Sequence, residues 1–170
     1  ATGQKSMHTD HFSPYPDGFS FDKKINDIYD SIDDETVAVM IELVQGEGGV
    51  QPFDKDEIQK LAKFLKENDI LLIVDEVQTG AYRTGEFLAS NLYEIEPDII
   101  TMAKGVGGGV PIGIVLTTHK DIFVPGDHGS TFGGNYLSTI SALEVCNILD
   151  DLKNDGTLDE TILYFENKLK

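Results

Sequence analysis

Short runs of apolar, often β-branched residues alternate along this chain with stretches whose apolar residues recur at helical spacing. Four such runs predict buried strands, at residues 37–44, 70–74, 98–102 and 111–117. Strands that are apolar throughout are covered on both faces, as is typical of parallel sheets. The alternation therefore predicts an α/β fold with a mostly parallel sheet flanked by helices.

Apolar residues recur with the period of an α-helix in four other segments. These segments are residues 21–32, 58–65, 137–152 and 158–169. Asp54 or Asp56 is expected to cap the second helix, because a carboxylate accepts a bond from the free amides of a first turn. Residues 1–20 are rich in Ser, Pro, Gly, Asp and His and predict a loop.

Composition excludes several classes of function. The 170 residues suit one domain, and 13 Lys and Arg against 30 Asp and Glu give a net charge of −17. Such acidity argues against a partner that is a nucleic acid or an anionic membrane. A single cysteine, Cys146, excludes an internal disulfide, and no apolar run reaches the roughly 18 residues of a membrane span. The chain starts at Ala1 and is expected to begin within a longer protein.

Polar residues follow three of the predicted strands, at 42–49, 75–78 and 104–109. Ligands of α/β sheets bind beyond the carboxyl ends of the strands, so these residues are the first candidates for a site. Asp75-Glu76 after an apolar strand has two other interpretations, a solvated turn or the magnesium-binding acids of a Walker-type ATPase. The ATPase interpretation requires a phosphate-binding G-x-x-x-x-G-K-[ST] loop, which this sequence lacks.

Lys104 follows a predicted strand and enters a run of glycines. A lysine held there and partly desolvated attacks a carbonyl to form a Schiff base, although a solvated lysine in a flexible loop fits the same residues. Residues 127–135 are expected to bind a phosphate or, as the segment alone favours, to cap the next helix. His8 and His11 lack partners with metal-ligand spacing, so no metal site is expected, and Cys146 is expected in the core.

A lysine, a carboxylate and a hydroxyl-bearing loop together match the needs of pyridoxal phosphate. The chain resembles the ornithine/acetylornithine branch of the class III aminotransferases, whose large domain has fold type I. The segments that carry the resemblance are residues 45–50, 74–80, 83–85, 104–105 and 128–135. They occur in the family's order and spacing over almost the whole chain.

The resemblance implies roles for the residues after the strands. Lys104 is the Schiff-base lysine and moves the substrate proton, and Asp75 pairs with the ring nitrogen of pyridoxal phosphate. Val77 packs on a face of the ring, Gln78 reaches its phenolic oxygen, and Glu76 belongs to the same cofactor-binding segment. Thr131 binds the phosphate of the neighbouring subunit's cofactor, and Ser130 lies beside the substrate. Glu47 pairs with a substrate-binding arginine.

The implied reaction moves the δ-amino group of N-acetylornithine to 2-oxoglutarate in arginine biosynthesis, in a cytoplasmic homodimer with shared active sites. Related amines (ornithine, succinylornithine or 4-aminobutyrate) remain alternatives, as does an inactive folded fragment. Residues 1–170 are expected to form the central part of the large domain, without its N-terminal segment and the C-terminal small domain. The fragment alone is therefore expected to be inactive. Leu43 and Tyr82 depart from the family pattern, where proline and glycine are usual.

Overall fold

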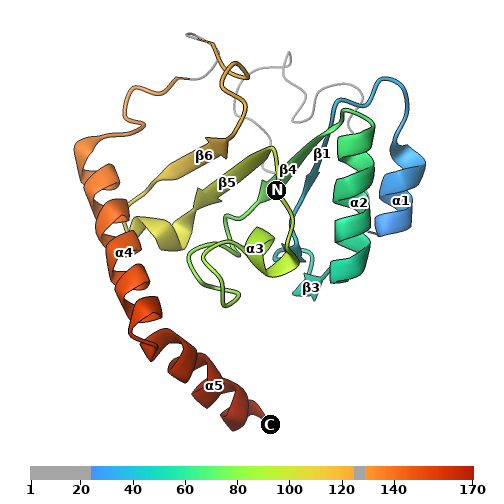
Figure 1. Cartoon of the computed structure of the whole chain (residues 1–170). Helices are drawn as coiled ribbons and strands as arrows, with labels where there is room; N and C mark the ends of the chain where they lie inside the picture. Colours follow the sequence, from blue (N-terminus) through green and yellow to red (C-terminus); the bar gives the residue numbers. More distant parts are fainter. Residues whose placement is uncertain (1–23, 125–128) are drawn as a thin grey trace.

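The computed structural model describes residues 24–124 and 129–170, and its centre is a four-stranded sheet of order β1-β4-β5-β6 (Figure 1). The strands are β1 (Ala38–Ile41), β4 (Leu71–Asp75), β5 (Ile99–Ala103) and β6 (Gly113–Thr117). β1, β4 and β5 are mutually parallel, whereas β6 runs antiparallel to β5. The predicted strands and the mostly parallel sheet are confirmed. A small antiparallel hairpin, β2 (Val44–Gln45) with β3 (Gln51–Pro52), follows β1.

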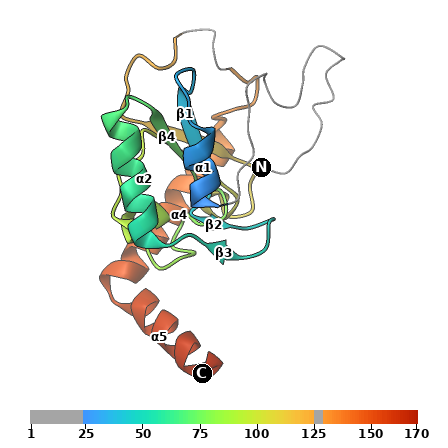
Figure 2. The ribbon, with the colours of Figure 1, turned by 90° about the vertical axis from the view of Figure 1, so that its right-hand side faces the viewer.

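Helices α1 (Ile25–Ser31), α2 (Lys55–Glu67) and α3 (Ala89–Tyr93) share one hydrophobic core with β1 and β4. Helices α1 and α2 lie side by side (Figure 2). The Asp54 carboxylate accepts a 3.1 Å bond from the Glu57 amide, so the predicted cap of α2 is confirmed. The helix predicted over residues 21–32 begins at Ile25, and residues 21–23 lie outside the described residues, as does the loop predicted at 1–20. The sequence did not predict α3, which is only five residues long.

The core lies between the sheet and these helices. Side chains at alternate positions of β4 point into it, because successive residues of a strand face opposite sides. The residues with no exposed surface are Leu43, Ile58, Leu61, Leu65, Val74 and Ala89. Each large apolar side chain buried in this way contributes about 1.5–3 kcal/mol to folding, which fixes β4 and the residues that follow it.

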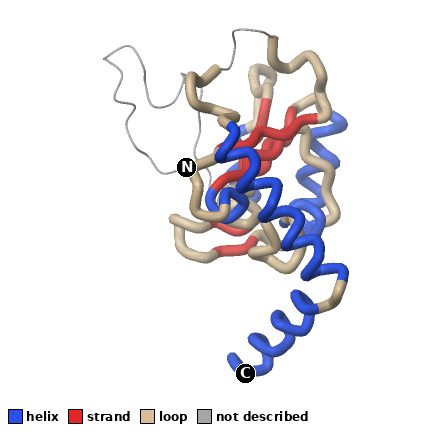
Figure 3. The backbone as a smooth tube through the Cα atoms, turned by 90° about the vertical axis from the view of Figure 1, so that its left-hand side faces the viewer, coloured by secondary structure: helices blue, strands red, loops and turns tan. Residues whose placement is uncertain are grey.

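Helices α4 (Tyr136–Asn154) and α5 (Thr157–Leu169) have a different environment. α4 packs against η1 (Lys104–Gly107), the short 3₁₀ helix after β5, and α5 extends away from the body of the molecule (Figures 1 and 3). Many of their apolar side chains are exposed: Leu137, Ile140, Leu143, Ile148, Leu163 and Phe165. Among the described residues, α4 fully buries only Ser138 and Ala142, and α5 buries none of its residues.

Strand β6 departs from the burial that its sequence predicts. Its apolar run indicated a strand covered on both faces, but Val115 and Leu116 are 44% and 42% exposed. The reason is position, because β6 is the last strand of the sheet and pairs only with β5 among the described residues. Cys146 likewise is half-buried, not a full core residue.

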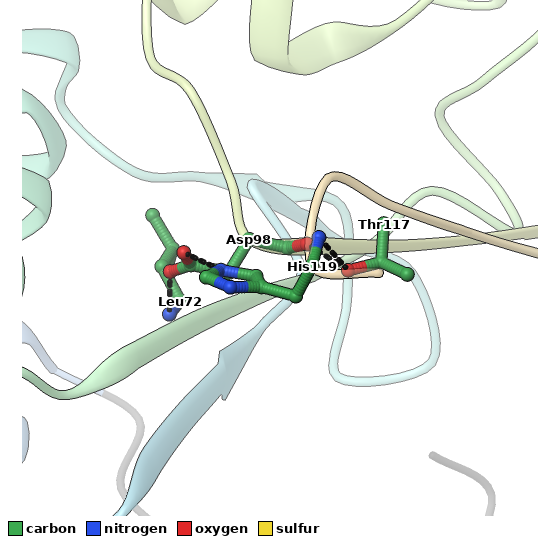
Figure 4. A network of polar contacts seen from close by, with 4 residues as sticks. All are labelled: Leu72, Asp98, Thr117 and His119. Carbon is green, nitrogen blue, oxygen red and sulfur yellow. Dashed lines mark hydrogen bonds and ion pairs between the residues drawn. The ribbon is translucent and has the colours of Figure 1, made fainter. Parts of the chain in front are cut away.

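A polar network joins β4, β6 and the residue before β5 (Figure 4). It lies at the end of the sheet opposite Asp75 and Lys104. The Asp98 carboxylate accepts a 2.8 Å bond from the Leu72 amide and lies 2.6 Å from Nε2 of His119. The Thr117 hydroxyl donates to the Asp98 carbonyl oxygen. Burial pushes the pKa of Asp98 upward, but the bonds from His119 and Leu72 outweigh it and hold that pKa below its usual value.

Within residues 24–124 and 129–170, no helix is both long enough and apolar enough to cross a bilayer.

Candidate active site

Asp75 and Lys104 leave the same edge of the sheet. Asp75 ends β4 and pairs in register with Thr101 of β5, and Lys104 follows β5 directly. The Asp75 Oδ1 atom accepts bonds from the Val77 amide (2.9 Å) and the Thr101 hydroxyl (3.2 Å). Oδ2 of Asp75 accepts no hydrogen bond from any described residue. One oxygen of this carboxylate is thus held in place while the other is available.

Lys104 has an unusual backbone conformation. Its φ is +51°, in the left-handed region that is unfavourable for a residue with a Cβ. The side chain is exposed, and its amine makes no hydrogen bond or ion pair with any described residue. Non-glycine residues in this region cluster at functional sites, because surrounding structure must hold them there.

The glycines after Lys104 allow η1 to approach α4. A Cβ on Gly108, whose φ is +60°, would lie 2.8 Å from Cγ2 of Val145. The Ser141 hydroxyl of α4 donates a 2.8 Å bond to the Gly107 carbonyl oxygen. These contacts hold in place the turn that begins at Lys104.

Lys104 lines a cavity of about 660 Å³ between the β2–β3 hairpin, the loop after β4, and α4. Ligand pockets of proteins typically measure ~300–1,000 Å³. The lining residues are Val44, Gln45, Gly46, Val50, Val77, Gln78, Thr79, Gly80, Ala81, Arg83, Thr84, Lys104, Gly105, Val145 and Leu149. Two cationic residues and no acidic residue belong to this set, although the whole chain has a net charge of −17. The lining therefore suits an anionic ligand.

Gln78 and Gly46 meet across the cavity wall. A Cβ on Gly46 would lie 2.3 Å from Nε2 of Gln78, so only glycine allows this approach. The Gly46 amide in turn donates to Oε2 of Glu42 (3.1 Å). The hairpin and the loop after β4 are thereby held next to each other.

Glu76 does not face the cavity, which corrects its expected place among the cofactor-binding residues. Its side chain is 1% exposed, and both carboxylate oxygens accept bonds from within the protein. The same contacts argue against the Walker-type alternative, because a carboxylate so engaged cannot activate water. No group of acidic, histidine or cysteine side chains in the described part of the chain has the arrangement of a metal site.

Ser130, Thr131 and Glu47 are not brought to the cavity that Lys104 lines. Ser130 accepts a bond from the Gly133 amide and lines a second cavity, of about 540 Å³, near the start of α4. Thr131 is exposed and lines neither cavity. Glu47 is exposed in the β2–β3 hairpin and directly follows Gly46, which lines the first cavity.

The segment around these residues ends in a helix cap. The Asn135 side chain accepts a 3.1 Å bond from the Ser138 amide, which satisfies a free donor of α4. The cap is therefore Asn135, and not Ser130 or Thr131. His128, the first residue of the motif read from the sequence, lies outside the described residues.

Sequence reasoning missed the α4 side of the cavity. Val145 and Leu149 line it, and their spacing of four residues on an apolar helix face was the available signal. Neighbouring Cys146 is no nucleophile candidate, because burial and then the negative charge of Asp150 raise the pKa of its thiol. Arg83 has an exposed side chain on the cavity lining.

Comparison with known proteins identifies similar chains. Residues 10–170 match the family model Aminotransferase class-III. Over its whole length the chain is 58% identical to acetylornithine aminotransferase of Wolinella succinogenes and matches 43% of that protein. It is 46% identical to acetylornithine aminotransferase of Aquifex aeolicus and again matches 46% of the relative. The chain thus spans less than half the length of these curated relatives.

Solved structures agree with these matches. An ornithine aminotransferase of Toxoplasma gondii, described with partial occupancy of PLP at its active site, is 36% identical with a TM-score of 0.76. That match covers 88% of this chain and 36% of the other. N-acetylornithine aminotransferase of Stenotrophomonas maltophilia is 35% identical, with a TM-score of 0.56 over 66% of this chain and 29% of that one.

Proposed function

This chain belongs to the class III aminotransferase family, and on that basis we propose that its protein transfers the δ-amino group of N-acetylornithine to 2-oxoglutarate. The observation that carries this proposal is the match of the entire chain, at 58% identity, to an acetylornithine aminotransferase. Because the chain spans 43% of that relative, the activity is proposed for a protein of the relative's full length.

The described residues fit pyridoxal phosphate, the cofactor of this family. The cavity offers the unpaired amine of Lys104 and a second cation, Arg83, without a competing carboxylate in the lining. The cofactor, when bound, supplies an aldehyde that captures amines and a protonated ring that withdraws electrons from the substrate carbon. A cavity with an amine and a net positive lining suits a phosphorylated aldehyde.

Lys104 has two tasks in this proposal. Its Nζ atom would hold the cofactor through the aldehyde carbon, with the aldehyde oxygen lost as water. Once a substrate amine has displaced it, the same Nζ atom would accept and return the proton of the substrate carbon. Both tasks require an amine that other side chains do not bind, and the Nζ atom of Lys104 has no partner among the described residues.

Asp75 is proposed to keep the ring nitrogen protonated through Oδ2, the oxygen that no described donor occupies. A fixed carboxylate serves this purpose well, since a charge already oriented requires no reorganisation during the reaction. We assign Val77 to one face of the ring and Gln78 to its phenolic oxygen, in keeping with their place on the cavity lining.

The assignments of Thr131 and Ser130 involve a second subunit. We propose that Thr131 binds the phosphate of the cofactor in the partner subunit of a homodimer, and that Ser130 lies beside the substrate. Neither residue lines the Lys104 cavity of its own chain, which supports a role in a shared site. Glu47 is proposed to pair with an arginine that binds substrate, from an exposed hairpin next to the cavity.

At the level of the whole protein, we propose that residues 1–170 form the central part of the cofactor-binding large domain. The name of the acetylornithine aminotransferase relatives implies arginine biosynthesis, which is the proposed pathway, and the cytoplasm is the proposed location.

Ornithine as the amino donor is the second candidate, because several similar structures are ornithine aminotransferases, including that of Toxoplasma gondii. The test is a competition assay with the full-length protein, loaded with pyridoxal phosphate and offered N-acetylornithine, ornithine, succinylornithine and 4-aminobutyrate with 2-oxoglutarate. The proposal predicts the highest kcat/KM for N-acetylornithine. A higher kcat/KM for any of the other three amines would contradict it.

A further inference from the structure

A buried carboxylate that the proposed chemistry does not use lies between two residues of the site. Glu76 follows Asp75 and precedes Val77, and its side chain is 1% exposed. An ionised carboxylate in such surroundings is costly unless hydrogen bonds replace its lost hydration. Its partners therefore indicate what the residue holds in place.

Four donors surround the Glu76 carboxylate. Oε1 accepts bonds from the amide (2.8 Å) and the hydroxyl (2.7 Å) of Ser90. Oε2 accepts bonds from the Thr79 hydroxyl (2.5 Å) and the Ala89 amide (2.9 Å). All four donors are neutral, so no cation compensates the charge and each bond is needed.

These bonds close residues 76–90, here called the wall segment, into a loop. One carboxylate at the start of the segment binds its middle, at Thr79, and its end, at Ala89 and Ser90. The Gly80 amide adds a 2.9 Å bond to the Glu76 carbonyl oxygen. Seven residues of the wall segment line the Lys104 cavity: Val77, Gln78, Thr79, Gly80, Ala81, Arg83 and Thr84.

The wall segment also has internal bonds, such as the 2.8 Å bond from the Ala81 amide to the Phe87 carbonyl oxygen, but its backbone is strained. Ala81 and Tyr82 have φ values of +55° and +62°, which are unfavourable for residues with a Cβ and must be held by their surroundings. Tyr82 contacts Phe87 edge-on within the same segment, with ring centroids 5.6 Å apart. The side chain at the start of this strained loop binds the middle and the end of the loop. The conformation of the loop therefore depends strongly on that side chain.

We propose that Glu76 is a positioning residue that fixes the wall segment and thereby sets the affinity of the cavity for the cofactor. The inference rests on the proposed function in one respect, since pyridoxal phosphate is the ligand used to measure affinity. Glutamine is the informative substitution, because its amide oxygen accepts from two donors while its NH₂ group confronts the other two.

The experiment compares Glu76→Gln with Glu96→Gln in the full-length protein. Glu96 is exposed and has no hydrogen bond to a described residue, so it controls for the loss of one charge. Glu76→Gln leaves a buried donor without an acceptor and so loosens the wall segment. We expect pyridoxal phosphate binding to weaken about tenfold as a result. Hydrogen exchange should accelerate within residues 76–90 and remain unchanged in α2. Glu96→Gln should match the wild-type protein in both measurements.

Two outcomes would overturn the proposal. One is wild-type affinity for pyridoxal phosphate in Glu76→Gln despite faster exchange in the wall segment, and the other is faster exchange spread evenly over the whole chain. A wild-type protein that fails to bind pyridoxal phosphate would refute the proposed function, while the exchange data would still test how Glu76 holds the segment.

A second pair of variants applies if Glu76→Gln does not fold. Thr79→Val removes one donor to Glu76 with little change of shape, and Thr79→Ser retains the hydroxyl. We expect severalfold weaker cofactor binding for the valine variant and recovery with serine. Equal affinities for the three proteins would overturn the proposal.

Discussion

The Thr101 hydroxyl of β5 donates a 3.2 Å hydrogen bond to Oδ1 of Asp75 on β4. This bond joins two parallel strands at the edge where Lys104 also emerges, and the Val77 amide donates to the same oxygen. The orientation of Asp75 therefore depends on a neighbouring strand as well as its own loop, which has a testable consequence.

Thr101→Val should weaken the proposed function of Asp75 without removing its charge. A hydrogen bond to an ionised group contributes about 1.5–3 kcal/mol, so we expect a loss of roughly 10- to 150-fold in pyridoxal phosphate affinity or kcat. Thr101→Ser retains the hydroxyl and should remain within about twofold of the wild-type protein. Titration of the cofactor into both variants checks this, and equal losses in the two would argue that shape matters and the bond does not.

Gly46→Ala should displace Gln78. The new Cβ would lie 2.3 Å from Nε2 of Gln78, so the side chain must leave its place on the cavity lining. We expect cofactor binding weaker by about 0.5–1.5 kcal/mol, the usual contribution of one hydrogen bond, because Gln78 is the residue assigned to the phenolic oxygen. Gly113→Ala is the control, because its Cβ would meet no atom within 4 Å. If Gln78→Ala leaves affinity unchanged, a loss in Gly46→Ala cannot be ascribed to Gln78.

Two glycines after Lys104 separate backbone strain from steric overlap. Gly108 and Gly109 both have positive φ, +60° and +96°, but only at Gly108 would a Cβ meet α4, 2.8 Å from Cγ2 of Val145. Gly109→Ala is expected to cost about 1–2 kcal/mol of unfolding free energy from backbone strain alone. Gly108→Ala should cost about 1–3 kcal/mol more. Urea denaturation measures both, and equal values would exclude the overlap.

Asp98 should contribute stability that depends on pH. Its pKa is lower in the folded chain than its ordinary value, so the contribution is present above about pH 4 and is lost as the pH falls through the folded pKa. Asp98→Asn should therefore destabilise the protein by about 1–2 kcal/mol at pH 7. The difference should shrink below about pH 4. Urea denaturation at pH 7 and pH 3 compares the two proteins, and a difference that grows toward pH 3 would contradict the sign.

Local sequence patterns predicted the strands and helices that the apolar spacing or capping residue of their own segment defines. The apolar run at residues 70–74 became β4, and Asp54 caps α2 as its spacing to Glu57 indicates. Burial of β6 was not predictable in this way, because an apolar run does not reveal whether a strand lies at the edge of its sheet. α3 was missed because five residues contain too little of a helical period.

Site residues that directly follow a predicted strand could be identified from the sequence. The orientation of a side chain that depends on tertiary contacts could not. Lys104 and Gln78 followed predicted strands, and the structure places both on one cavity lining. No local pattern indicates that Glu76 turns inward while its neighbour Val77 lines the cavity. That difference depends on donors at Ala89 and Ser90, more than ten residues further along the chain.

The central claim is that Lys104 is the residue that bonds the cofactor. The most direct test incubates the full-length protein with pyridoxal phosphate, reduces the bond with borohydride, and maps the modified peptide by mass spectrometry. We expect one pyridoxyl group per chain, on Lys104, and none in Lys104→Ala. A pyridoxyl group on a different lysine of the wild-type protein, with Lys104 unmodified, would show that Lys104 does not bond the cofactor.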